Sequence, residues 1–181
     1  MRVGATSATQ TDQYSLESDE PMRAASVALS GVIELSDWFA LQGELGFVRK
    51  GTRRGEDFAV RSDYIEMPLL LRFSTPFAYH GARAFLVRGI ADAKELRCFG
   101  YRTGPDYDVF TSFKIEYDCD DMRDLRTDRS GVLGGGLLLD RGAGQFTIEL
   151  RRTRGGNVGY ACCALHNNVT SVVVGFARSM R

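Results

Sequence analysis

The chain has 181 residues, with 23 basic and 23 acidic side chains, so its formal net charge is zero. This length fits a single domain over residues 1–181, and the charge balance excludes a global field that would attract nucleic acid. Hydrophobic residues make up 44% of the chain, yet no apolar run approaches the roughly 18 residues that a transmembrane helix needs. If this chain crosses a membrane, it does so as strands.

Eight segments with apolar residues at every second position predict β-strands. They cover residues 2–8, 23–35, 38–50, 59–73, 82–94, 129–139, 145–154 and 168–178. The connections at 36–37, 74–81 and 140–144 are short, whereas those at 9–22, 51–58, 95–128 and 155–167 are long. In an up-and-down barrel this alternation places all short turns at one rim, as in outer-membrane barrels with brief periplasmic turns and long external loops.

The alternation also separates two faces of each strand. In the segment 38–50, Leu41 and Leu45 fall on one face and Gln42 and Glu44 on the other. A soluble barrel turns the apolar face inward, whereas a membrane barrel turns it towards lipid. Charges in mid-strand favour the membrane barrel, because a closed interior can pair them and burying them unpaired costs several kcal/mol each. The predicted interior network consists of Glu34, Glu44, Glu66, Arg72, Arg88, Glu149 and Arg151.

The opposite faces carry residues suited to lipid. The last two segments supply Phe146, Ile148, Leu150, Val172, Val174 and Phe176. Aromatic residues near strand ends are typical of interfacial girdles, and here they are Trp38, Phe39, Phe47, Phe73, Phe77 and Tyr79. Open strand edges cannot remain in hydrocarbon, so the strand at 2–8 should pair with the strand at 168–178.

Two central strands carry a family resemblance. Residues Trp38–Gly51 read WFALQGELGFVRKG, and Asp63–Arg72 read DYIEMPLLLR. These stretches resemble the PorT-like outer-membrane β-barrel domain family, whose later glycine-rich and terminal strands correspond to Arg129–Leu139 and Val172–Phe176. The resemblance implies a small outer-membrane barrel with no catalytic residues to carry over. Pro68 belongs to the motif, so we keep its strand and predict a bulge or a missing hydrogen bond there.

Cys98, Cys119, Cys162 and Cys163 all fall in the predicted external loops and outside the predicted strands. This placement suits a disulfide framework in an oxidising compartment. A Cys98–Cys119 bond would close the 95–128 loop and is the favoured pairing. The alternatives join these two cysteines to Cys162 and Cys163, or leave all four thiols free. Cys162, Cys163 and His166 match no standard zinc spacing, so we predict no metal site.

The sequence therefore predicts an eight-stranded antiparallel up-and-down transmembrane β-barrel of the bacterial outer membrane. We expect a structural or interaction scaffold that displays external loops, with no enzymatic activity and no cofactor. Its expected partners are outer-membrane lipid, lipopolysaccharide and a protein at the external loops. Arg151, Arg152 and Arg154 lie near the external end of their predicted strand, where they either contact lipopolysaccharide phosphates or form a charged rim. A soluble lipocalin-like barrel with an apolar interior, and a narrow channel or lipid-modifying enzyme, are the alternatives. Residues Met1–Thr6 do not resemble a signal peptide, so we expect the sequence to begin at the mature domain.

Overall fold

The computed structural model describes residues 2–12, 20–54, 58–105, 112–118, 127–141, 144–160 and 163–177. Its strands are β1 (Arg2–Asp12), β2 (Glu20–Glu34), β3 (Phe39–Arg54), β4 (Phe58–Ser74), β5 (Ala82–Pro105), β6 (Ser112–Asp118), β7 (Thr127–Arg141), β8 (Gly144–Tyr160) and β9 (Cys163–Ala177). Within these ranges, no helix is long and apolar enough to cross a membrane.

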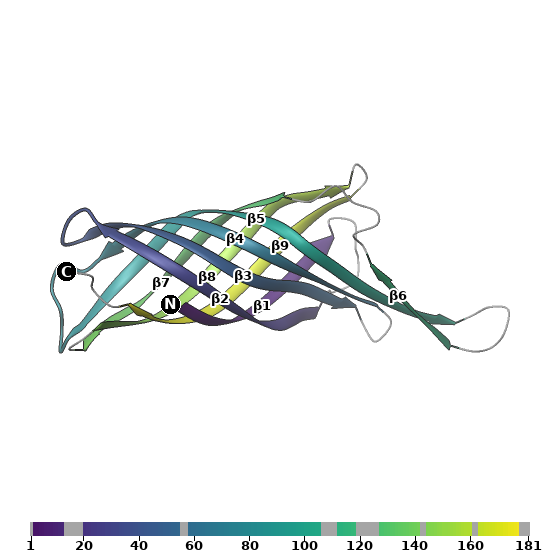
Figure 1. Ribbon diagram of the computed structural model, residues 1–181, viewed down its shortest axis with the longest axis horizontal. Coiled ribbons are helices and arrows are strands. Elements are labelled where there is room, and N and C mark those ends of the chain that lie inside the picture. Colours follow the sequence, from purple (N-terminus) through teal and green to yellow (C-terminus); the bar gives the residue numbers. More distant parts are fainter. Residues whose placement is uncertain are drawn as a thin grey trace.

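The strands form one antiparallel sheet that closes on itself (Figure 1). Its order is β4-β3-β2-β1-β9-β8-β7-β5-β6, and a further pairing joins β4 to β5. Strand β1 pairs with β9 from Arg2↔Gly175 to Asp12↔Leu165, so the predicted pairing of the first and last strands is confirmed. The predicted eight-stranded up-and-down barrel is present, with β6 added beside the distal part of β5.

The strands extend further than predicted at one end of the barrel. Strand β5 continues to Pro105 and pairs with β6 from Phe99↔Asp118 to Pro105↔Ser112, inside the region predicted as a loop at 95–128. This β5–β6 hairpin projects from the end of the barrel (Figure 1). Strands β8 and β9 likewise occupy most of 155–167. The prediction of long loops is therefore wrong over much of these two regions.

A β-bulge in β5 explains why the apolar alternation of the predicted strand 82–94 ends before the strand itself does. The β4–β5 register passes from Tyr64↔Glu95 to Asp63↔Arg97, which leaves Leu96 without an opposing residue. Such a bulge changes which face the following residues occupy, and here Glu95 and Cys98 are both buried. Cys98 thus lies within β5, and Cys163 begins β9. The prediction that no cysteine falls in a strand is wrong.

The short turns lie at the opposite end from the β5–β6 hairpin (Figure 1). In the turn between β4 and β5, His80 and Gly81 adopt φ angles of 50° and 77°, a left-handed conformation that glycine accepts at no steric cost. Three aromatic rings gather at this rim: Phe39 and Phe73 lie 5.1 Å apart, and Trp38 lies 5.9 and 6.3 Å from them. Exposed Phe77 and Tyr79 lie in the neighbouring turn. These positions agree with the predicted aromatic girdle at one interface.

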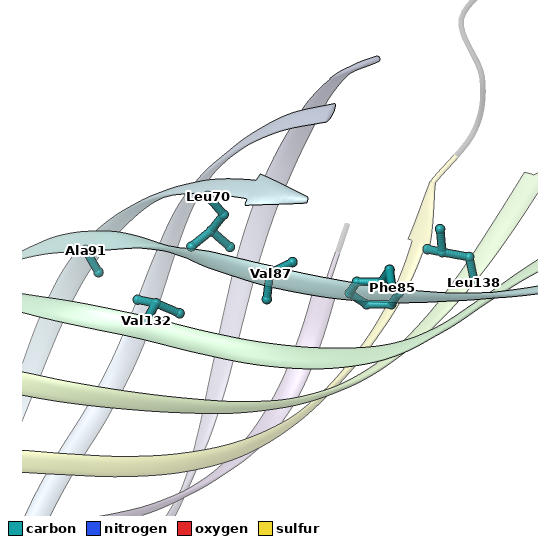
Figure 2. Packing of buried hydrophobic residues seen from close by; sticks show 6 residues of the cluster. All are labelled: Leu70, Phe85, Val87, Ala91, Val132 and Leu138. Atoms are coloured by element: carbon teal, nitrogen blue, oxygen red, sulfur yellow. The ribbon is translucent and has the colours of Figure 1, made fainter. Parts of the chain in front are cut away.

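The two faces of the wall are as the membrane interpretation predicts. Leu45, Ile148 and Val174 point outward and are 53%, 48% and 51% exposed. The interior contains polar side chains together with one apolar cluster from β4, β5 and β7, shown in Figure 2. That cluster consists of Leu70, Phe85, Val87, Ala91, Val132 and Leu138.

Pro68 interrupts the β3–β4 ladder without shifting it. The pairs run from Gly43↔Leu69 to Gly46↔Glu66 in one register, with no pairing between them. On its other side Pro68 pairs with Ala91 of β5. Since proline has no N–H to donate, the missing hydrogen bond is confirmed, and the alternative of a bulge in this ladder is not. The missing pairs lie beside Glu44, a residue of the predicted interior network.

Candidate functional site in the barrel interior

A run of glycines in β7 lies opposite the charged residues of β8. Gly134 of β7 pairs with Arg151, and Gly136 pairs with Glu149. A Cβ added to Gly134 would lie 2.8 Å from the carbonyl oxygen of Leu150, and one at Gly136 would overlap the backbone at Ile148. Glycine at these positions therefore allows β7 to approach β8 closely, as the sequence predicts for strand glycines in a barrel.

Arg151 spans the interior between strands that are not neighbours. Its Nη1 and Nη2 donate to Oε2 and Oε1 of Glu44 on β3, both at 2.9 Å. Its Nε donates to Oε1 of Glu149 at 2.7 Å. The side chains of Arg151, Glu44 and Glu149 are only 8%, 4% and 0% exposed. Strands β2, β1 and β9 separate β3 from β8 in the sheet, so this forked ion pair joins opposite parts of the wall.

A second buried cation lies further along β3. Lys50 Nζ is 3.4 Å from Glu66 Oε1 on β4 and 3.5 Å from Asp128 Oδ2 on β7. It also lies 4.8 Å from the centre of the Tyr64 ring. Alternation in the predicted strand 38–50 already assigns Lys50 to the polar face with Gln42 and Glu44, although Lys50 is not part of the predicted charge network. Asp128 lies in the predicted loop 95–128, and continuing the alternation of the strand 129–139 by one residue would have placed it inside.

Most of the predicted network lies inside the barrel, but not all of it. Arg72 is 4% exposed and lies 3.7 Å from Glu34, which is exposed at the short-turn rim. Arg88 is exposed on the outer face, where its cross-strand partners are Leu71 and Leu133. Placing Arg88 in the interior is therefore wrong, because the inward positions of β5 belong to Val87 and its apolar neighbours. The predicted outward role of Arg151 is also wrong, since it is buried.

The charge cluster borders a small cavity of about 40 Å³. Its lining includes Glu44, Glu66, Pro68 and Arg151. A space of this size holds on the order of one to three water molecules. Among the described residues, no three His, Cys, Asp or Glu side chains form a group that could hold a metal ion. Around this cavity the arrangement is thus a set of ion pairs that connects opposite walls.

The cysteine predictions are tested only in part. Cys98 is fully buried, while Cys119 and Cys162 lie outside the described residues. The disulfide pairing stays a prediction.

The chain matches no protein-family model and no curated protein, so the PorT-like resemblance stays a prediction. It is similar to solved structures of outer-membrane β-barrel proteins. Neisserial surface protein A has 8% identity and a TM-score of 0.52, covering 98% of this chain and 95% of that one. Ail, the attachment invasion locus protein of Yersinia pestis, solved with the heparin analogue sucrose octasulfate, has 11% identity and a TM-score of 0.48, covering 97% and 94%. The N-terminal β-barrel domain of Pseudomonas aeruginosa OprF has 13% identity and a TM-score of 0.35, covering 96% of each chain. At these identities the likeness to the Neisserial protein supports the fold alone.

Proposed function

We propose that this protein is a small bacterial outer-membrane barrel that acts as a structural or interaction scaffold and catalyses no reaction. The observation that carries this proposal is the inverted distribution of side chains. Glu149 and Asp128 are fully buried inside, while large apolar side chains such as Leu29, Leu133 and Leu150 are 66%, 63% and 59% exposed outside. A water-soluble barrel has the opposite arrangement, whereas a barrel in lipid requires this one.

Outward apolar residues recur on every barrel strand whose side chains the structure describes. The exposed set includes Ile33, Leu45, Leu69, Leu86, Leu137, Ile148 and Val174. Contiguous exposed apolar patches larger than roughly 300–600 Å² are rare on soluble monomers. Burial of this band in hydrocarbon removes it from water, and closure of the sheet leaves no strand edge in lipid.

We infer the scaffold role from two parts of the structure, the barrel with its internal ion pair and the strands that extend beyond it. The interior is crossed by the Arg151–Glu44 ion pair, which connects β3 with β8. The β5–β6 hairpin extends beyond this part of the barrel (Figure 1). We infer that the short turns face the periplasm and that the extended strands project outside the cell, where they present a surface to a protein partner or to lipopolysaccharide.

The two alternatives fit the interior less well. A lipocalin-like barrel needs an apolar ligand cavity, but Glu44, Glu66 and Arg151 border the interior cavity here. A narrow channel needs open volume, and that cavity measures about 40 Å³.

The test is to express the chain, refold it in detergent and examine its electrophoretic mobility with and without boiling. A membrane barrel remains folded in SDS until heated, so the unboiled and boiled forms should migrate differently. Solubility without detergent together with unchanged mobility would refute the membrane proposal.

A further inference from the structure

The outer face carries a shallow apolar groove over β2, β3, β4 and β5, with a volume of about 320 Å³. The outward side chains that line it are Val27, Leu29, Leu45, Phe47, Ile65 and Leu96. Leu96 is the residue at the β-bulge of β5, so the register shift that extends β5 also supplies one wall of the groove. The small residues Ala28 and Gly46 complete the lining.

Directly beyond this groove, towards the extended end of the strands, the outer face becomes charged. On β3 the next outward residue after Phe47 is Arg49, and Lys94 of β5 is the cross-strand partner of Ile65. On the same side, Arg97 follows Leu96 and pairs in register with Asp63. Charged outward residues therefore appear on three adjacent strands beside the groove, as expected where hydrocarbon gives way to headgroups.

The charge at this boundary is predominantly positive. We call Arg49, Arg61, Lys94 and Arg97 the basic patch. Among the side chains that the structure describes on these strands, the carboxylate of Asp63 accepts a hydrogen bond from Arg49 Nε at 2.6 Å. The neighbouring carboxylate of Asp92 is held by Arg129 Nε at 2.7 Å. Asp63 thus compensates Arg49, and Arg61, Lys94 and Arg97 add three further cations beside the apolar groove.

We propose that the groove and the basic patch together bind one molecule of lipid A, with an acyl chain in the groove and the phosphates on the patch. A free phosphate would leave the groove unused, and an uncharged lipid would leave the cations uncompensated. Lipid A carries two phosphates on a multi-chain anchor, which suits several clustered cations better than the single phosphate of a phospholipid does. This inference rests on the proposed function, which places the extended strand ends at the outer leaflet, where lipid A lies.

The test measures lipid retained by the refolded full-length protein in detergent, using native mass spectrometry with diphosphoryl lipid A or phosphatidylglycerol added. Lys94→Gln combined with Arg97→Gln should weaken lipid A binding about ten-fold, because two charge-assisted contacts to phosphate are lost. Ile65→Trp should weaken it independently by filling the groove. Arg152→Gln combined with Arg154→Gln removes the same charge from the outer face of β8, where the sequence alone suggested either a lipopolysaccharide contact or a charged rim. Because these two exposed side chains do not line the groove, their loss should change binding less than about two-fold, which separates the two candidate positions.

Equal loss in the β8 control variant, equal binding of phosphatidylglycerol, or no retained lipid A would each overturn the inference. Heat-dependent mobility is measured on the same samples. If all variants fold as barrels but the Lys94 and Arg97 substitutions do not weaken lipid A binding, the proposed lipid A site is wrong and the membrane-barrel proposal is unaffected. If the wild-type protein is soluble without detergent and shows no mobility shift, the proposed function fails together with the site.

Discussion

Arg151 and Glu44 lie on non-adjacent strands of the barrel and form a forked ion pair, with both terminal nitrogens of the arginine 2.9 Å from the two carboxylate oxygens. Glu149 shares the same guanidinium. Arg151→Leu removes the cation between two buried carboxylates, so we expect a loss of about 3–5 kcal/mol in the free energy of unfolding. Urea unfolding of the refolded protein, followed by the fluorescence of Trp38, measures this loss. An unchanged free energy of unfolding would show that the Arg151–Glu44 ion pair does not stabilise the barrel.

Arg88 provides a matched arginine on the other face of the wall. It lies outside, between Leu71 of β4 and Leu133 of β7, where hydrocarbon would surround it. Arg88→Leu should leave stability unchanged or raise it by up to about 4 kcal/mol, because an arginine on the lipid face costs roughly 0–4 kcal/mol according to depth. The same unfolding measurement applies. A loss as large as that of Arg151→Leu would mean that Arg88 has an interior role.

The contrast between these two arginines shows how far the sequence alone could reach. Alternation identified the two faces of β3 and β8, because polar and apolar residues separate cleanly there. In β5 both faces are largely apolar: Val87 and Ala91 are fully buried inside, and Leu86 and Ile90 are exposed outside. With no contrast between the faces, the single charge at Arg88 suggested the wrong one.

The extent of β5 and the contact between Lys50 and Asp128 could not be predicted, because they depend on how distant parts of the chain pair. The period-two pattern of β5 is broken at Leu96, so its continuation through Cys98 read as a loop. Lys50 and Asp128 are 78 residues apart in the chain. They meet because barrel closure and strand register bring β3 and β7, which β4 and β5 separate in the sheet, to face one interior. The local sequence pattern of a strand predicts neither the closure of the sheet nor the register between distant strands.

Gly136 should be intolerant of any larger side chain. A Cβ there would overlap the carbonyl oxygen of Ile148 on the neighbouring strand, so Gly136→Val should push β7 away from β8 and greatly reduce the folded fraction. Gly131 lies on the same strand with nothing within 4 Å of an added Cβ, so Gly131→Val is the control and should fold normally. The fraction of heat-shifted protein after refolding compares the two. Equal folding yields would contradict the close approach of the strands.

Cys98 should form a disulfide with Cys119. The last described pair of the β5–β6 hairpin is Phe99↔Asp118, and Cys98 and Cys119 are the residues next to this pair in the sequence. We expect Cys98 to resist thiol labelling in the denatured, unreduced protein and to become labelled after reduction. Cys119→Ser should expose Cys98 to the label without reductant, whereas Cys162→Ser should not. If Cys162→Ser exposes Cys98 to the label and Cys119→Ser does not, the alternative bond between Cys98 and Cys162 is favoured.

The barrel interior should pass no steady ionic current. The cavity beside Glu44 and Arg151 measures about 40 Å³, enough for only about one to three water molecules, and the bidentate contact between these two residues crosses the interior. Wild-type protein inserted into planar lipid bilayers should therefore leave their conductance at the level of the protein-free membrane. Arg151→Ala removes the side chain that crosses this space and should raise the frequency of brief openings. A sustained current from the wild-type barrel would instead support the narrow-channel alternative, because it would require a water-filled path past this ion pair.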